Sequence, residues 1–321
     1  MHHVTMVSTP DDGSCGIGTY TGNLLAAMPD DLTVNWITVP LRSTNPLPYI
    51  FCAFRAGITT DPTVHVQHEY GIYGPKSIWS WLFFLLLSLL TTIRQRRVII
   101  TFHSAWSHET ISPPLIPIKR LYVAANNRLL AMTTDHAVFL SNNAATEFQR
   151  SVQLDSVETI PHGVQTDTRS LSQEAAKQEL GYEADDQLII LPGYIRPEKG
   201  CDVFVTLAEQ FNSPFVLTGG CQDACDYCAE LRERAPSNVE ITGQLDEKTF
   251  HSAFAAADLV VLPYRDVTQS GVFNLCVAYE VPVLGSDTPY FRSLAEECGC
   301  VDVVDTEEID IAAERVRELL S

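Results

Sequence analysis

The chain has 321 residues and a formal net charge of −19, from 21 basic and 40 acidic side chains. This length predicts two domains or one large barrel, and the 45% content of hydrophobic residues supplies a sizeable core. So acidic a chain repels nucleic-acid phosphates, which excludes nonspecific nucleic-acid binding and leaves nucleotide phosphates to local cationic or backbone-amide sites.

The start of the chain, "MHHVTMVSTP", predicts a strand over 3–9 and not a signal peptide. The cysteine number is odd and the cysteines are scattered, which favours free thiols in a reducing cytoplasm over a disulfide framework. The nine cysteines are at positions 15, 52, 201, 221, 225, 228, 276, 298 and 300.

A glycine-rich turn follows this first strand and opens a predicted helix over 16–28. The turn contains Gly13, Gly16 and Gly18 in "TPDDGSCGIGTYTGNLL". A glycine-rich turn at a helix N-terminus points free amides and the positive end of the helix dipole at an anion, so this turn is a candidate phosphate contact.

Predicted strands over 32–40, 63–69 and 97–103 follow, and polar side chains come at the ends of the last two. "QHEYGIYG" supplies His68 and Glu69, and "TFHSAWSH" supplies His103 and Ser104. Ligands of open parallel sheets bind at the carboxyl ends of strands. These four residues therefore predict a rim that faces a sugar or an acceptor.

An apolar helix is predicted over 77–95, within "SIWSWLFFLLLSLLTTIRQRR". The residues between Lys76 and Arg94 would span roughly 25 Å as a helix, less than the ~30 Å of a bilayer core. We therefore expect a buried or interfacial helix and not a membrane span. Its tryptophans and terminal arginines suit a helix that lies at an anionic membrane surface, so residues 78–97 are a candidate peripheral membrane contact.

The first half ends with a predicted helix over 115–134 and strands over 136–141 and 157–163. A polar segment then leads to a helix over 170–180 and a second run of alternating strands and helices. Such alternation predicts parallel sheets of β-α-β units. We expect two doubly wound domains, at 1–164 and 165–321.

Two cations follow the first strand of the second half, which is predicted over 187–193. Arg196 and Lys199 lie in "LPGYIRPEKGCDVF", before a predicted helix over 199–211. In a chain with only five lysines, two cations at a strand end indicate a diphosphate clamp.

Three cysteines follow the next predicted strand, over 215–220. Cys221, Cys225 and Cys228 have the spacing C-x3-C-x2-C, which resembles the cluster loop of radical S-adenosylmethionine enzymes. Only 93 residues follow the third cysteine, too few for the barrel that such an enzyme needs. An iron–sulfur enzyme therefore stays a remote alternative.

The remaining predicted strands cover 238–243, 258–264 and 282–287, with helices over 225–235, 246–257 and 270–280. Gln269, Ser270, Gly271 and Val272 follow the second of these strands at the start of the last helix. Small residues at a helix start allow backbone amides to approach a phosphate, so these four are candidate donor contacts.

Several segments together resemble glycosyltransferase family 4, the retaining group with the GT-B fold. The segments cover about residues 4–307, and "GYIRPEKG" and "AAADLVVLPYR" are the most specific. They are "GIGTYTGNLL", "QHEYGIYG", "TFHS", "IPHGV", "GYIRPEKGCD", "ITGQLDEKTFHSAFAAADLVVLPYRD" and "QSGVFNLCVAYEVPVLGSD".

The resemblance implies two Rossmann-like domains that face each other across a cleft, with the acceptor on the N-terminal domain and a nucleotide-diphosphate sugar on the C-terminal domain. It implies that Gly16 and Gly18 approach the donor phosphates, that Arg196 and Lys199 bind the diphosphate, and that His103 contacts the transferred sugar. No cofactor and no metal are expected, because the two cations do what a divalent ion does elsewhere. The implied enzyme is a cytoplasmic hexosyltransferase of polysaccharide or glycolipid biosynthesis.

The chain departs from the family at a glutamate pair spaced E-x7-E, whose positions fall near Val267 and Leu275. Glu280 also stands where the family has a glycine. In the family the pair contacts the sugar and the ribose. An inactive glycosyltransferase-like scaffold or a nucleotide-sugar epimerase therefore remains the alternative to a transferase.

Overall fold

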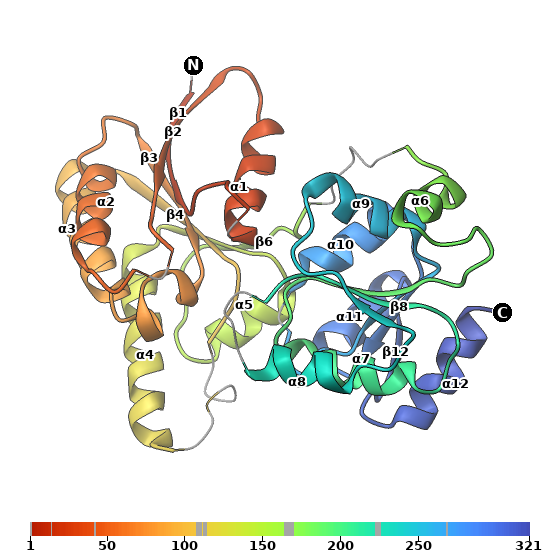
Figure 1. The fold of residues 1–321 in the computed structure, drawn as a ribbon. Helices are drawn as coiled ribbons and strands as arrows, with labels where there is room; N and C mark the ends of the chain where they lie inside the picture. The colour runs from red at the N-terminus through yellow and green to blue at the C-terminus, as the bar shows by residue number, and fades with distance from the viewer. Residues whose placement is uncertain are drawn as a thin grey trace. The chain divides into compact units, whose positions relative to one another are not determined.

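The computed structural model describes residues 2–13, 15–41, 43–106, 111, 114–163, 170–221, 226–267 and 269–321. These residues form two compact units, 1–162 and 163–321, and each contains a six-stranded parallel sheet (Figure 1). The division falls two residues before the boundary expected from the sequence. Cys225 lies outside the described residues.

The sheet of the N-terminal unit has the strand order β2-β1-β3-β4-β5-β6. Its strands begin and end within a few residues of the predicted ones. They are β1 (His2–Ser8), β2 (Leu32–Thr38), β3 (Thr63–His68), β4 (Arg97–Phe102), β5 (His136–Phe139) and β6 (Val157–Thr159). The helices are α1 (Gly16–Ala26), α2 (Leu47–Gly57), α3 (Ser80–Arg94), α4 (Ile116–Thr133) and α5 (Asn142–Gln149). Sequence analysis missed α2 and α5.

Helices α2, α3 and α4 lie side by side on one face of this sheet, and α1 lies on the other (Figure 1). Gly57, at the end of α2, allows close packing there, since a Cβ at this position would lie 2.6 Å from Cβ of Leu90 on α3. Ser80 Oγ on α3 donates to Asn126 Oδ1 on α4 at 2.8 Å. The three helices are therefore packed as one layer.

The sheet of the C-terminal unit has the order β12-β11-β10-β7-β8-β9. Its strands are β7 (Ile189–Pro192), β8 (Phe215–Thr218), β9 (Val239–Ile241), β10 (Leu259–Leu262), β11 (Val283–Ser286) and β12 (Asp302–Val304). Its helices are α6 (Gln173–Leu180), α7 (Cys201–Ala208), α8 (Asp226–Arg234), α9 (Glu247–Ala256), α10 (Gly271–Ala278), α11 (Pro289–Cys298) and α12 (Ile309–Leu319). Sequence analysis missed β12, α11 and α12.

The four central strands of this sheet are buried along their whole length, which is typical of a parallel sheet covered on both faces. Their continuous apolar runs explain why they were predictable. The missed strand β12 is an edge strand of three half-buried residues, Asp302, Val303 and Val304, so it carries almost no hydrophobic signal.

Four cysteines form two disulfides, Cys221–Cys228 and Cys298–Cys300. The expectation of free thiols is wrong for these four, because each pair is close enough in sequence to meet within one loop and helix end. Cys15, Cys52, Cys201 and Cys276 are free thiols.

No helix in the described part of the chain is long and apolar enough to cross a membrane. Helix α3 has 15 residues, and it buries Phe83, Phe84 and Leu87 against the sheet.

Candidate functional site

The strand order of the C-terminal unit places its switch point between β7 and β10. From β7 the chain continues to β8 and β9 on one side, and from β10 it continues to β11 and β12 on the other. The loops after two such strands diverge and leave room for a ligand at their carboxyl ends. Arg196 and Lys199 follow β7, and Tyr264 and Arg265 follow β10.

Lys199 lies over the ring of Tyr264, with its Nζ atom 3.6 Å from the ring centroid. Burial, together with the nearby positive charge of Arg196, lowers the pKa of Lys199 to about 8. No ion pair within the described ranges involves Lys199. The Lys199 ammonium group is therefore held by a cation–π contact with Tyr264, and its three N–H groups remain able to donate hydrogen bonds to an anion.

Arg196 is half-buried at the start of the same loop, where its Nη1 atom lies 3.5 Å from Oε1 of Glu198. A pair so near the surface contributes little stability, and the contact holds the guanidinium loosely. The structure thus brings together the two cations that the sequence predicted, on one loop at the switch point.

Gly200 allows this loop to approach the loop after β10. Its φ is +64°, and a Cβ there would lie 2.0 Å from the carbonyl oxygen of Pro263. Gly219, after β8, packs as closely, since its Cβ would lie 1.7 Å from the carbonyl oxygen of Gly193. The loop that carries Arg196 and Lys199 is therefore wedged between its two neighbours.

Arg265 fixes the loop from the side of β10. Its Nη1 and Nη2 atoms donate to both carboxylate oxygens of Asp202 at 2.8 Å each, and the Tyr227 hydroxyl donates to the same carboxylate at 2.7 Å. Burial alone would raise the pKa of Asp202, but the hydrogen bonds from Arg265 and Tyr227 lower it to about 2. Asp202 is therefore a permanent anion that anchors Arg265.

The start of α10 is the second candidate anion contact of this unit. Ser270 is buried; its Oγ accepts from the amide of Phe273 at 3.2 Å and its own amide donates to the Tyr290 hydroxyl at 3.2 Å. The amides of Gly271 and Val272 belong to the first turn, where they have no intrahelical acceptor. Gln269, half-buried, immediately precedes this turn.

In the N-terminal unit, His103 lies at the carboxyl end of β4. It is buried, its Nε2 atom is 2.9 Å from Oε1 of Gln67, and its ring meets Tyr20 of α1 edge-on at 4.9 Å between centroids. Burial lowers its pKa to about 3. His103 is therefore a neutral imidazole with its proton on Nε2, which leaves Nδ1 as an acceptor.

His68 lies in the core and not on the rim that the sequence predicted. It is fully buried among Tyr70, Tyr73, Phe84 and Phe102, with ring centroids 4.7–5.6 Å away. Burial lowers its pKa to about 3. The last residue of β3 points into the aromatic layer beneath α3, so it cannot touch an acceptor.

Glu69 and Ser104 are both half-buried at the strand ends. The Glu69 side chain caps the short helical turn Tyr70–Ile72, where it accepts from the amide of Gly71. The Glu69 carboxylate therefore stabilises this turn. Ser104 follows His103 directly and stays a candidate acceptor contact.

The glycines at the start of α1 differ in what surrounds them. A Cβ on Gly18 would lie 1.9 Å from the carbonyl oxygen of Pro10, so Gly18 allows α1 to pack on the loop that precedes it. A Cβ on Gly16 would meet nothing within 4 Å. The open backbone at Gly16 is thus the better place for an approaching phosphate.

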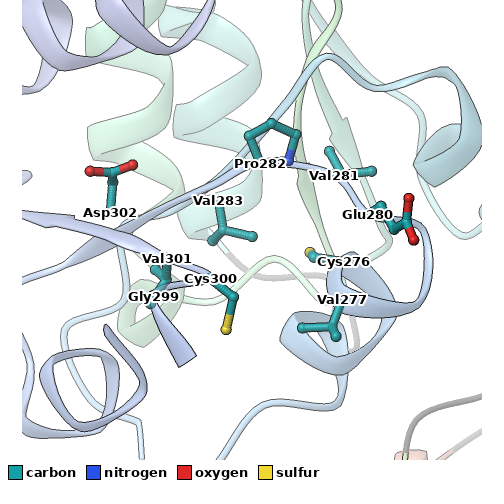
Figure 2. Close-up of a pocket in the computed structure, with 10 residues that line it drawn as sticks. All are labelled: Cys276, Val277, Glu280, Val281, Pro282, Val283, Gly299, Cys300, Val301 and Asp302. Carbon is teal, nitrogen blue, oxygen red and sulfur yellow. The ribbon is translucent and has the colours of Figure 1, made fainter. Parts of the chain in front are cut away.

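A pocket of about 390 Å³ opens in the C-terminal unit at the amino ends of its strands, opposite to the carboxyl ends that Arg196 and Lys199 follow (Figure 2). It is lined by Cys276, Val277, Glu280, Val281, Pro282, Val283, Gly299, Cys300, Val301 and Asp302. These residues surround the amino ends of β11 and β12, away from Arg196 and Lys199. Glu280 has a φ of +56°, a left-handed conformation that glycine adopts more easily.

Sequence analysis missed the residues that hold the cations in place. Tyr264 and Arg265 come from the loop after β10, Asp202 from α7 and Tyr227 from α8, and nothing in their spacing indicates that they meet. A signal did exist for two of them, because Arg265 follows a buried strand and Asp202 follows the Lys199-Gly200 pair.

Comparisons with known proteins agree with this architecture. Anabaena HepE in complex with UDP-glucose superposes with a TM-score of 0.75 and 14% identity, over 100% of this chain and 90% of that chain. The protein therefore has the GT-B fold, as the sequence predicted. Residues 186–321 match the family model "Glycosyl transferases group 1", so the C-terminal unit contains a group 1 glycosyltransferase domain.

Two curated relatives match parts of the chain. It is 23% identical over 190 residues to alpha-galactosylglucosyldiacylglycerol synthase of Streptococcus pneumoniae, which is 56% of this chain and 50% of that protein. It is 35% identical over 88 residues to glycogen synthase of Hydrogenovibrio crunogenus, which is 26% of this chain and 18% of that protein. The match thus spans half or less of the length of either relative. Together with the domain match, the two relatives support a glycosyltransferase.

Proposed function

We propose that the protein is a retaining glycosyltransferase that moves a sugar from a nucleotide-diphosphate sugar to a sugar or lipid-linked acceptor. The observation that carries this proposal is the pair of Arg196 and Lys199 on one wedged loop at the switch point of the C-terminal sheet. Lys199 is held by the Tyr264 ring, and no carboxylate among the described residues forms an ion pair with it, so its charge is available to a diphosphate.

The demanding step in this reaction is departure of the nucleoside diphosphate from the anomeric carbon. Negative charge grows on the diphosphate as the bond breaks, and Arg196, Lys199 and the amides that start α10 would stabilise it. A preorganised donor of this kind contributes about 3–4 kcal/mol to the transition state. Because cations of the chain fill this role, we propose that the reaction needs no metal ion.

The neutral imidazole of His103 suits a contact with the transferred sugar. Its Nδ1 atom can accept a hydrogen bond from a sugar hydroxyl, and a pKa of about 3 keeps the ring uncharged beside the positive charge that develops on the sugar. In a retaining reaction the acceptor attacks the face that the diphosphate leaves. The acceptor would then enter beside the leaving group.

The test compares donor binding and turnover in Arg196→Ala, Lys199→Ala and the control Lys248→Ala. Lys248 lies in the same unit and pairs with Glu179 at the surface. A screen of nucleotide sugars by thermal shift identifies the donor, and the UDP-glucose bound by Anabaena HepE makes that compound the first choice. We expect at least a hundredfold loss of turnover in each of the first two variants and none in the control.

Near-normal turnover in both alanine variants would contradict the clamp. Binding of a nucleotide diphosphate without any transfer or hydrolysis would instead identify an inactive scaffold. An altered sugar on the recovered nucleotide would identify an epimerase. The absence of acidic residues at Val267 and Leu275 makes these outcomes worth measuring.

A further inference from the structure

Helices α2 and α3 of the N-terminal unit each expose a continuous apolar stripe. On α2 the stripe consists of Leu47, Phe51 and Phe54, with Ile58 just after the helix. On α3 it consists of Leu82, Leu85, Leu89 and Ile93, with Ile78 just before the helix. These nine side chains are between 37% and 68% exposed. Their spacing of three and four residues places each set on one face of its helix.

The two stripes belong to one surface, because α2 and α3 pack side by side with Gly57 against Leu90. Both helices bury the opposite side against the sheet, through residues such as Tyr49 and Ala53 on α2 and Phe83 and Leu87 on α3. The apolar stripes therefore both face away from the sheet. Exposed apolar surface of this extent marks a site of interaction. We call these nine residues the α2–α3 face.

The charge around the α2–α3 face is opposite to that of the rest of the chain. Helices α2, α3 and α4 contain no aspartate or glutamate. The segment 43–134, which includes them, holds eight of the 21 basic residues and only three of the 40 acidic ones. The basic residues are Arg55, Lys76, Arg94, Arg96, Arg97, Lys119, Arg120 and Arg128.

Four of these basic residues, Arg55, Lys76, Arg94 and Arg97, lie at the ends of the α2–α3 face. Helices α2 and α3 each lead into the start of a parallel strand, so their C-terminal residues Arg55 and Arg94 lie at the same edge of the sheet. Lys76 lies at the other end, where its carbonyl oxygen accepts from Tyr122 of α4. Arg55, Lys76, Arg94 and Arg97 are all exposed, and no ion pair in the described part of the chain involves any of them.

We propose that the α2–α3 face binds the surface of an anionic bilayer. The apolar side chains would enter the boundary between headgroups and acyl chains, and the flanking arginines and Lys76 would contact lipid phosphates. A chain with a net charge of −19 is otherwise repelled by such a surface, which makes an acid-free layer of three helices a specific exception. No helix within the described residues can span a membrane, so the contact is peripheral.

This surface also indicates the source of the acceptor, in a step that depends on the proposed function. The unit that carries the face is the one expected to hold the acceptor, so an acceptor carried in the bilayer would reach it without leaving the membrane. A lipid-linked hydroxyl is therefore the favoured acceptor class. Vesicle binding tests the face without any nucleotide sugar, so its failure is distinguishable from failure of the glycosyl transfer.

The experiment measures binding of the full chain to vesicles of phosphatidylcholine, with and without phosphatidylglycerol. We expect binding to the anionic vesicles that weakens as salt rises, because salt screens the lipid charge. Leu85→Asp with Leu89→Asp, and separately Arg55→Glu with Arg97→Glu, should each weaken binding at least tenfold. Matched controls are Ile311→Asp on α12, an exposed apolar residue of the other unit, and Arg232→Glu with Arg234→Glu on α8.

Circular dichroism and donor hydrolysis should be unchanged in all four variants, which excludes misfolding as the cause. The proposal is overturned if the unaltered protein does not bind anionic vesicles, or if the face variants bind as the controls do. It is also overturned if light scattering shows a dimer that the Leu85→Asp, Leu89→Asp variant converts to a monomer without any vesicle binding. That result would assign the face to a second copy of the chain.

Discussion

The guanidinium of Arg265 forms a two-pronged hydrogen bond with the carboxylate of Asp202, with both N–O distances at 2.8 Å. The same residue donates from Nη1 to the carbonyl of Pro197 and from its backbone amide to the carbonyl of Glu198, each at 2.9 Å. Arg265 therefore holds the middle and the far end of the loop that carries Arg196 and Lys199. We expect Arg265 to affect donor binding indirectly, through the position of that loop.

Replacing Arg265 by lysine keeps the positive charge but removes the two-pronged geometry. We expect Arg265→Lys to raise the KM for the donor about tenfold and to lower the unfolding free energy by only about 1 kcal/mol, because the pair is partly exposed. Steady-state kinetics and urea unfolding measure the two effects. Arg292→Lys, which alters the surface pair with Asp287, should change neither. An equal rise in the KM for the donor in both variants would contradict a role of Arg265 in positioning the loop.

Lys199 should make donor use depend on pH near neutrality. Because burial lowers its pKa to about 8, the free enzyme loses this cation as the pH rises through 8, and kcat/KM for the donor should fall there. Lys199→Arg keeps its charge throughout and should lose that alkaline limb. A pH profile shared by the original enzyme and Lys199→Arg would contradict the assignment.

Lys199 also has a cost in stability. A lysine whose pKa is lowered on folding binds fewer protons in the folded than in the unfolded state between about pH 8 and 10.5, so its contribution to stability rises with pH across that window. At pH 7 the buried charge is unfavourable. Lys199→Met should therefore raise the unfolding free energy at pH 7, by on the order of 1–3 kcal/mol, while it abolishes donor turnover. A less stable Lys199→Met protein would contradict this.

Gly200 and Gly181 form a matched pair for testing the wedged loop. Both have left-handed backbone, with φ of +64° and +86°, but a Cβ on Gly200 would strike Pro263 and a Cβ on Gly181 would meet nothing within 4 Å. Gly181→Ala should cost about 1 kcal/mol of unfolding free energy from backbone strain alone. Gly200→Ala should cost about 2 kcal/mol more and weaken donor binding. Chemical denaturation measures the unfolding free energy, and donor titration measures the affinity. Equal losses of unfolding free energy in the two variants would contradict the close packing at Gly200.

Three histidines with lowered pKa values should make the N-terminal unit sensitive to acid. Burial lowers the pKa of His65 to about 4 and those of His68 and His103 to about 3. The unfolded state binds these protons near pH 6.5 and the folded state does not, so stability is complete above that pH and falls as the pH drops toward 3.

His68→Leu isolates one of these protons. His68 has no hydrogen-bond partner among the described residues, so its replacement should leave stability at pH 7.5 equal or higher by about 1 kcal/mol. The slope of unfolding free energy against pH, measured by urea denaturation between pH 7 and 5, should decrease by up to one proton. A slope identical to that of the original protein would show that His68 does not titrate on unfolding.

Strands and motif loops were predictable because a buried parallel strand is a continuous apolar run and its loop follows directly. The runs "LIILP" and "LVVLP" located β7 and β10, and so located Arg196. The helix α2 was missed because prolines flank its first residue, at Pro46 and Pro48, and because "LPYIFCAFRAG" is rich in aromatic residues, features that resemble a strand or a turn. Its helical character depends on packing against α3, which no local pattern contains.

The sequence also did not show whether a side chain near a strand end is buried in the core or faces the ligand side. His68 and His103 both lie in the last two positions of a predicted strand, yet His68 points into the aromatic layer under α3 and His103 contacts Tyr20 beyond the strand end. Side chains alternate between the two faces of a sheet along each strand. This alternation would predict where each histidine points only if the register of the two strands were known. The disulfide between Cys221 and Cys228 likewise depends on how the loop after β8 folds back on α8.

Glu280, in the turn between α10 and β11, holds a left-handed backbone without the benefit of being a glycine. Such a conformation costs a residue with a side chain about 1–2 kcal/mol. The turn lies at the amino edge of the sheet, remote from the loops that would meet a nucleotide. Replacing Glu280 by glycine would remove this strain and raise the unfolding free energy of the chain. That added stability could offset destabilising substitutions made elsewhere to alter donor preference.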